Sequence, residues 1–293
     1  MMPHQLNWQE ICQMIPKRKA DAQKGDFGRL LCITGSRNMP GACLLSTQAA
    51  LRGGLVTVAT APENPMRLAA AAPEAMWLPL ETDEAGFLRS SDQNRKTLEK
   101  QLSRANAMLL GCGLGVTEET RRLVHWVLEQ AVCPVVLDAD GLNCAVSCIE
   151  LSRRTGKDWI LTPHPGEMAR LTGHSIPQIQ ENRVETATQF AAAYPVTLAL
   201  KGAGTLVAQG SRLAQNPTGN PGMSRGGSGD VLAGLIAAFA AQGIPSWEAA
   251  CAGVYLHGLA GDAAAAALSQ QAMLPRDLLV YLPQVLVKLE QER

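Results

Sequence analysis

Residues 220–243 read NPGMSRGGSGDVLAGLIAAFAAQG and place four glycines and one carboxylate directly before a long apolar run. The run from Val231 to Ala241 has no charged residue and is rich in alanine and leucine, which favours a buried helix. The first N–H groups of a helix have no partner inside it and carry the positive end of the helix dipole. Because glycine lets an anion approach such groups closely, the segment predicts an anion site where this helix begins.

Asp230 is the one carboxylate of this segment and stands beside the expected anion. It suits a general base that takes a proton from a substrate hydroxyl while the glycine amides hold a phosphoryl group in transfer. We expect the helix end to keep Asp230 ionised at neutral pH. The alternative is that Asp230 caps the helix and the glycines only form a tight turn.

Short apolar runs alternate with amphipathic helical stretches through most of the chain. Continuous apolar strands, each followed by a helix, are typical of a parallel sheet covered on both faces. The predicted fold class is therefore α/β, with a central, mainly parallel sheet and helices on both faces. The expected strands are residues 29–34, 55–60, 107–110, 134–138, 159–162, 196–201 and 205–209. Three helices are expected to follow at residues 230–242, 246–269 and 275–290.

The residues just after these strands are expected to carry the chemistry, since ligands bind beyond the carboxyl ends of strands in open α/β sheets. Five of the strands lead into loops of suitable composition. These loops are Gly35-Ser36, GCGLG (111–115), DADGLN (138–143), PHPGE (163–167) and KGAGT (201–205). Their convergence on one edge is stronger evidence for a site than any single loop.

Three of the loops carry side chains for which the sequence leaves two interpretations open. Asp138 and Asp140 suit Mg²⁺ bound through water, or an Asx turn with a helix cap. His164 stands between two prolines and suits a substrate contact, or is an incidental side chain in a rigid turn. Residues 201–205 suit a cradle for nucleotide phosphates, or form the turn of a β-hairpin. The other histidines are expected to be structural or surface residues: His4, His125, His174 and His257.

Composition and spacing argue against several classes of protein. The glycines of residues 111–115 do not have the G-x-G-x-x-G spacing of dinucleotide-binding dehydrogenases, and Ser228 stands where a phosphate loop requires lysine. The 26 basic residues equal the 26 acidic ones, so no net field favours nucleic acid or a membrane surface. Eight scattered cysteines without a C-x-x-C pair, and no visible secretory signal, predict a protein of the reducing cytoplasm.

The motifs as a set resemble a known family. They are KGDFGRLLCITGS (24–36), MPGACLLSTQAALRGG (39–54), GCGLG, DADGLN, LTPHPGEMARL (161–171), LKGAGTLVA (200–208) and NPGMSRGGSGDVLAG (220–234). The set is similar to the NAD(P)H-hydrate dehydratase family, the YjeF-type carbohydrate kinase-like domain of the ribokinase-like superfamily, over nearly the whole chain. The resemblance implies one ribokinase-like domain over residues 1–293, without an N-terminal epimerase domain, so that a separate epimerase serves the same pathway.

The resemblance also implies a repair reaction. The substrate is the S epimer of hydrated NADH or NADPH, and a nucleotide phosphorylates its ring hydroxyl before phosphate leaves and the reduced cofactor is restored. Bacterial members typically use ADP, giving AMP and phosphate, whereas eukaryotic members use ATP. Mg²⁺ is the implied cofactor, Asp138 its candidate ligand through water, and a homo-oligomer the implied assembly.

Site residues follow from the motifs by the same resemblance. Asp230 is the implied base, and the implied anion hole is Gly226, Gly227, Ser228 and Gly229. The implied nucleotide contacts are Lys201, Gly202, Ala203, Gly204, Thr205 and Gly229. The implied substrate contacts are Ala42, Gly113 and Gly115, with His164 and Asp230. Cys112, Gly141 and Arg225 depart from the family's usual residues, and Arg225 leaves the preference for ADP over ATP open.

Two other functions are compatible with these residues. A ribokinase-like kinase for a vitamin alcohol would use the same Asp230 and anion hole but stop at the phosphate ester. A catalytically silent nucleotide-binding protein would bind ADP without turnover, and the intact Asp230 argues against it.

Overall fold

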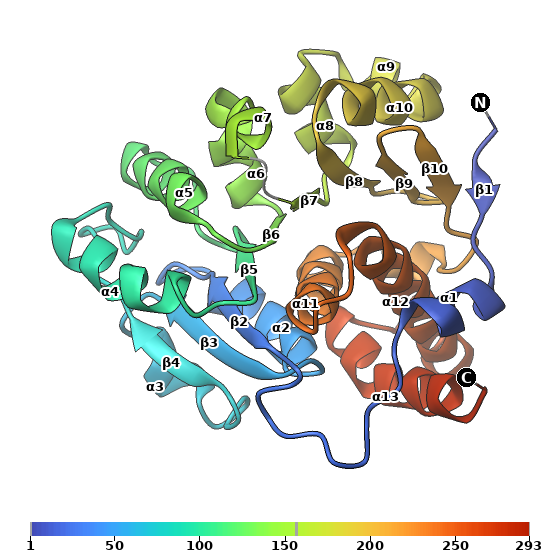
Figure 1. The fold of residues 1–293 in the computed structure, drawn as a ribbon, viewed down its shortest axis with the longest axis horizontal. Coiled ribbons are helices and arrows are strands. Elements are labelled where there is room, and N and C mark those ends of the chain that lie inside the picture. Colours follow the sequence, from blue (N-terminus) through green and yellow to red (C-terminus); the bar gives the residue numbers. More distant parts are fainter. Residues whose placement is uncertain (1, 156–157, 293) are drawn as a thin grey trace.

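A computed structural model describes residues 2–155 and 158–292. The strands are β1 (His4–Gln5), β2 (Arg29–Ile33), β3 (Leu55–Thr60), β4 (Met76–Pro79), β5 (Ala107–Leu110), β6 (Val135–Leu137), β7 (Trp159–Leu161), β8 (Val196–Leu200), β9 (Leu206–Gln209) and β10 (Arg212–Gln215). They form one ten-stranded sheet in the order β1-β10-β9-β8-β7-β6-β5-β2-β3-β4 (Figure 1). Only the pairs β8–β9 and β9–β10 are antiparallel in this sheet of described residues, which confirms the predicted α/β fold with a mainly parallel sheet.

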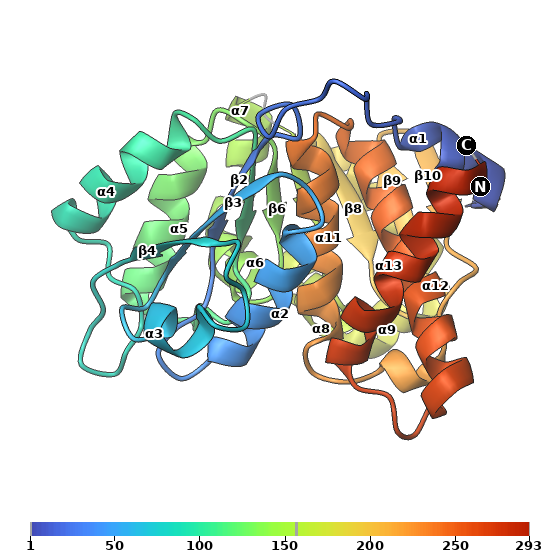
Figure 2. The same ribbon diagram turned by 90° about the horizontal axis from the view of Figure 1, so that it is seen from below.

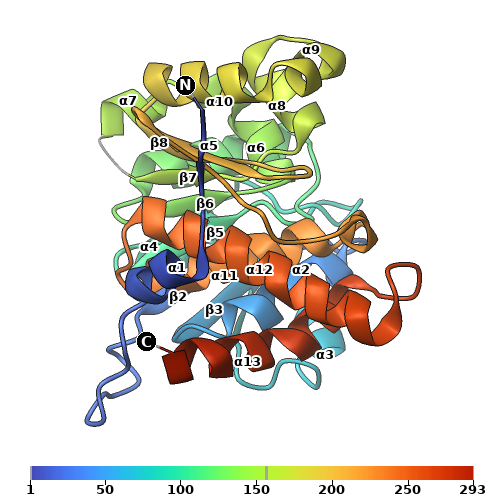
Figure 3. The same cartoon turned by 90° about the vertical axis from the view of Figure 1, so that its right-hand side faces the viewer.

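Helices cover both faces of this sheet. The helices are α1 (Trp8–Met14), α2 (Pro40–Ala50), α3 (Asn64–Leu68), α4 (Asp92–Leu102), α5 (Glu118–Gln130), α6 (Asp140–Ala145), α7 (Leu151–Thr155), α8 (Pro165–Thr172), α9 (Ile176–Glu181), α10 (Arg183–Ala193), α11 (Ser228–Ala241), α12 (Ser246–Leu268) and α13 (Pro275–Glu292), with short 3₁₀ helices η1 (Val146–Cys148) and η2 (Pro221–Met223). Figure 3 shows α8, α9 and α10 on one side of the sheet and α11, α12 and α13 on the other.

Alternate side chains of the central strands enter two separate cores. In β2, Leu30 and Cys32 pack with the α11 side, whereas Leu31 and Ile33 pack with the α5 side. This division follows from the two-residue period of a strand that is buried on both faces. It explains why the sequence of the strand is continuously apolar rather than alternating.

Helix α11 is as buried as its sequence predicts. Every residue from Val231 to Ala241 is buried, and the helix lies between α2 and α12. Figure 2 shows α2 and α11 side by side. A Cβ on Gly234 would lie 2.2 Å from the carbonyl oxygen of Ser46, so only glycine permits this close approach of α11 to α2.

The seven expected strands are all present, with ends that differ by at most one residue. Strands β1, β4 and β10 were not predicted. Strand β1 has two residues, and β4 is largely exposed or half-buried, so neither carries a readable apolar pattern. In the described part of the chain, no helix combines the length and the apolar character that crossing a membrane requires.

Candidate active site

The five motif loops lie at one edge of the sheet. Strands β8, β7, β6, β5 and β2 are consecutive neighbours and all run parallel, so their carboxyl ends meet there. Helix α11 packs against β5 and β6, which brings its start to the same edge. The convergence predicted from the loops is confirmed.

A cavity of about 780 Å³ opens between three of these loops, the segment 216–230 and helix α12. This volume is typical of a small-molecule site, which spans roughly 300–1,000 Å³. The predicted site residues that line it are Asp138, His164, Lys201, Gly202, Ala203, Gly204, Thr205, Gly226, Gly227, Ser228, Gly229 and Asp230. A smaller cavity of about 380 Å³ lies at α1 and Trp247, and none of its lining residues belongs to a motif loop.

Among the described residues, that lining leaves out Ala42, Gly113 and Gly115, although the three lie in neighbouring loops. A Cβ on Gly113 would lie 2.9 Å from the Cβ of Ala42, and the Gly115 amide donates to Asp140 Oδ2 at 2.8 Å. The structure therefore brings Ala42 and Gly113 together, but beside the cavity rather than in its wall. Asp140 binds this glycine loop.

The backbone at the start of α11 is shaped by Gly227. It precedes the helix with a φ of 107°, and a Cβ there would lie 2.7 Å from Leu45 Cδ1. Asp230 is the third residue of the helix, and no side chain caps this end, so the alternative in which Asp230 is the cap is wrong. The Ser228 amide donates to the Arg225 carbonyl at 3.3 Å. The Ser228 N–H is therefore already engaged, and the N–H groups of the neighbouring glycines are the main donors available to an anion.

The protonation of Asp230 differs from the sequence-based expectation. Burial, with a further contribution from the charge of Asp138, raises the pKa of Asp230 to about 7. The expectation that the helix end keeps Asp230 ionised at neutral pH is therefore wrong for the protein without ligands, in which both protonation states are populated near pH 7. A pKa near the operating pH is favourable for a general base.

Lys201 is held by carboxylates of the protein itself. Its Nζ lies 2.6 Å from Asp138 Oδ1 and 3.8 Å from Glu167 Oε2, and the hydroxyl of Thr162 donates to the same Asp138 oxygen at 2.7 Å. Burial lowers the pKa of Lys201, but the two carboxylates outweigh it and the pKa is raised, so the side chain stays charged. A Cβ on Gly229 would lie 3.2 Å from this Nζ, so the ammonium faces the start of α11.

The backbone of residues 201–205 connects β8 to β9, which pair antiparallel. The hairpin interpretation is therefore correct for the backbone. The same residues also line the cavity, so the two interpretations of this loop do not exclude each other.

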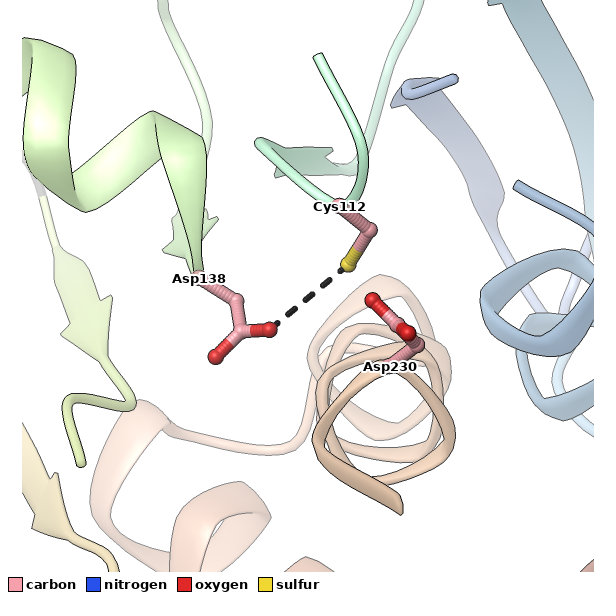
Figure 4. A group of neighbouring side chains, drawn as sticks. All are labelled: Cys112, Asp138 and Asp230. Carbon is pink, nitrogen blue, oxygen red and sulfur yellow. Dashed lines mark hydrogen bonds between the residues drawn. The ribbon is translucent and has the colours of Figure 1, made fainter. Parts of the chain in front are cut away.

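Cys112, Asp138 and Asp230 form a compact group between the glycine loop and the start of α11 (Figure 4). One ligand atom from each residue lies within 4.8 Å of the others, and the Cys112 thiol donates to Asp138 Oδ2 at 3.8 Å. Burial holds the pKa of Cys112 well above its usual range, so the sulfur is a neutral thiol, which Mg²⁺ does not favour. The two carboxylates fit Mg²⁺. Asp138 Oδ2 is the more available oxygen, because it accepts only the long bond from the Cys112 thiol, whereas Lys201 and Thr162 occupy Oδ1.

His164 is the N-cap of α8. Its Nδ1 accepts hydrogen bonds from the amides of Gly166 at 2.9 Å and Glu167 at 3.3 Å, so the ring is part of a rigid turn. The ring also lines the cavity. Burial and the charges of Lys201 and Arg170 lower the pKa of His164, which leaves it neutral at physiological pH.

Sequence reasoning missed His257, which lines the cavity from the middle of α12. The expectation that it is a structural or surface residue agrees with its burial and its hydrogen bond to Ser228, but not with a place in the cavity wall. The only available signal was a histidine within the otherwise apolar run CAGVYLHGLAG, where an unexplained polar side chain invites a search for its partner.

The fold and this site define an α/β protein of the ribokinase-like class, with a glycine-lined helix start and a carboxylate at the edge of a nucleotide-sized cavity. Within that class, the chain belongs to the NAD(P)H-hydrate dehydratase family, whose sequence model matches residues 30–284. The family resemblance drawn from the motifs is confirmed.

Similar proteins support this assignment. The chain is 42% identical over 281 residues to a bifunctional NAD(P)H-hydrate repair enzyme of Moorella thermoacetica. The aligned region covers 95% of this chain and 53% of that relative. It is 38% identical to the ADP-dependent (S)-NAD(P)H-hydrate dehydratase of Neisseria meningitidis, over 84% of this chain and 80% of that protein. The structure of a Bacillus subtilis ADP/ATP-dependent NAD(P)H-hydrate dehydratase, co-crystallised with ATP and Mg²⁺, superposes with a TM-score of 0.81, 31% identity and coverage of 98% and 99%. The chain spans about half the length of the bifunctional relatives.

Proposed function

We propose that this protein dehydrates the S epimer of hydrated NADH and NADPH with ADP as co-substrate, restoring the reduced cofactor and releasing AMP and phosphate. One observation carries the proposal: Asp230, with a pKa of about 7, lies at the glycine-lined start of α11 in the wall of a cavity of about 780 Å³. That arrangement pairs a base with an anion site, as phosphoryl transfer to a hydroxyl requires.

In the first step Asp230 accepts the proton of the ring hydroxyl, whose oxygen attacks the β-phosphorus of ADP. The bond between that phosphorus and the bridging oxygen breaks, and AMP leaves. The amides of Gly226, Gly227 and Gly229 hold the transferred group, while the Lys201 ammonium balances the added charge.

In the second step the lone pair of the ring nitrogen expels phosphate, breaking the C–O bond. The adjacent ring carbon then loses a proton to water, the electrons of the C–H bond form the C=C bond, and the double bond of the reduced nicotinamide is restored. The same amides favour the departing phosphate, since they interact more strongly with an ion that carries more charge.

Mg²⁺ fits this site through Asp138, directly or by way of water, and when bound it supplies positive charge to the nucleotide phosphates. A separate epimerase would convert the R epimer of the hydrate into the S epimer that this site uses. The bifunctional relatives are named as repair enzymes, which is consistent with such a coupled activity.

The test is an assay with hydrated NADH, Mg²⁺ and ADP or ATP, which follows the return of the absorbance of the reduced cofactor. We expect recovery with the wild type and a loss of about 10²- to 10⁴-fold with Asp230→Asn, since a general base contributes that much. Asp92→Asn, at an exposed carboxylate on α4, is the matched control. Accumulation of a stable phosphate ester would instead identify a small-molecule kinase. Equal rates for Asp230→Asn and wild type would refute the role of Asp230.

A further inference from the structure

His257 is a buried polar side chain in an apolar helix. It is 8% exposed, it lies midway along α12, and its neighbours Leu256 and Val254 belong to the hydrophobic core. Its Nε2 lies 3.0 Å from the carbonyl oxygen of Ser228, the first residue of α11. The ring therefore joins α12 to the first turn of α11.

The hydrogen bond defines the protonation of the ring. A carbonyl oxygen only accepts, so Nε2 must carry the hydrogen. Burial lowers the pKa of His257 to about 4, with a smaller contribution from the charge of Lys201. At neutral pH the ring is thus uncharged, donates through Nε2 and adds no net charge near the anion site.

The bonded carbonyl shares its peptide unit with the Gly229 amide. In a planar trans peptide the C=O and the N–H point in opposite directions, so fixing the Ser228 carbonyl also fixes the direction of the Gly229 N–H. Gly229 lines the cavity and faces the Lys201 ammonium. The Ser228 carbonyl also lies within the hydrogen-bond ladder of α11, so His257 supplies a second hydrogen bond that comes from outside the helix. An apolar residue at position 257 would remove this second bond and leave the peptide unit held by the helix alone.

We propose that His257 is a positioning residue, which holds the Ser228–Gly229 peptide so that the Gly229 N–H points at the phosphoryl group in transfer. The inference rests on the proposed function. It gives helix α12 a role in the reaction, although this helix contains none of the sequence motifs.

The first test compares His257→Gln with His257→Met. Glutamine places an N–H donor close to the position of Nε2, whereas methionine has similar length and no donor. We expect His257→Met to lower kcat about tenfold or more, since removal of a whole oxyanion donor costs roughly 10²–10³, with a smaller change in the KM for ADP. His257→Gln should remain within about threefold of wild type by the same reasoning. His174→Met, at an exposed histidine, is the matched control.

The second test does not depend on turnover. In protein labelled with ¹⁵N-glycine, inorganic phosphate should shift the Gly229 amide resonance of the wild type and of His257→Gln, and shift it much less in His257→Met. Equal shifts and equal kcat in the two variants would overturn the proposal. If phosphate shifts Gly229 while hydrated NADH is not converted, the positioning role stands and the proposed function fails.

A measurement on the wild type guards against variants that do not fold. With ¹⁵N-histidine labelling, the His257 ring should show a protonated Nε2 and an unprotonated Nδ1 at neutral pH. The opposite tautomer would remove the hydrogen bond on which the inference depends.

Discussion

Asp230 experiences opposing influences at the start of α11. The helix dipole favours its carboxylate, whereas burial and the nearby Asp138 disfavour it, and the balance raises its pKa to about 7. In the proposed reaction the phosphate groups of the nucleotide would add negative charge, and the positive charge of Lys201 and of Mg²⁺ would favour the ionised base. A residue that is poor for stability is thereby suited to catalysis.

The pH profile of the free enzyme should report this residue. The ionised carboxylate is the active base, so kcat/KM should fall about tenfold per pH unit below a midpoint near 7. The measurement is the rate between about pH 5 and pH 9 with nucleotide and hydrate both well below their KM values, so that the profile reports the enzyme without ligands. A profile that stays flat down to about pH 5 would show that the base has an ordinary carboxyl pKa.

Asp230→Asn should be more stable than wild type in alkaline solution. The folded pKa of Asp230 lies above the unfolded value near 3.9, so its contribution is full below about pH 4 and is lost as pH rises through about 7. Removing the charge should raise the unfolding temperature by a few degrees at about pH 8 and by less at about pH 5. Thermal unfolding at both pH values checks this, and a constant difference between variant and wild type would contradict it.

At the scale of elements, the site depends on the order of the strands. Asp138 follows β6 and Lys201 follows β8, 63 residues later, and they meet because only β7 lies between these strands. Lys201→Met would leave Asp138 buried without its cation, which should lower the free energy of unfolding by about 3–5 kcal/mol.

The matched variant is the double substitution Asp138→Asn with Lys201→Met, which removes both charges. We expect it to recover much of the stability that the single substitution loses, because no buried charge is left unpaired. Chemical denaturation of both proteins measures the difference. A double variant no more stable than Lys201→Met would show that the pair contributes through packing instead.

The turn before α11 offers a comparison between adjacent glycines. Gly227→Ala should destabilise the protein by about 1–3 kcal/mol, because its φ is 107° and a Cβ would collide with Leu45. A Cβ on Gly226 meets no atom of the described chain within 4 Å, so Gly226→Ala should leave the unfolding temperature nearly unchanged. Equal unfolding temperatures for the two variants would contradict this account of the turn.

Elements with strong local patterns were predictable from the sequence. The strands that lead into the site, β2, β5, β6, β7 and β8, are continuous apolar runs. The glycines before α11 indicate a helix start without any knowledge of packing. Strands β1 and β10 were not predictable, because β1 is two residues long and pairs with β10 across most of the chain. A strand of two residues is too short to show the alternation of apolar and polar side chains from which a strand is predicted.

At the scale of the whole molecule, the features of the site that could not be predicted from the sequence are contacts between residues far apart along the chain. The bond from His257 to Ser228 and the pair of Asp138 with Lys201 require α12 and β8 to be placed first. The raised pKa of Asp230 likewise arises from burial, which no local pattern reports. A single domain over residues 1–293 and self-association stay predictions, and the latter can be measured by light scattering.

The most direct test of the central claim is one ³¹P NMR time course of the protein with ADP, Mg²⁺ and hydrated NADH. The account predicts that AMP and inorganic phosphate appear in equal amounts, each matched by restored NADH, and that Asp230→Asn abolishes all three signals together. A lasting phosphate ester, or NADH restored while ADP is unchanged, would contradict it.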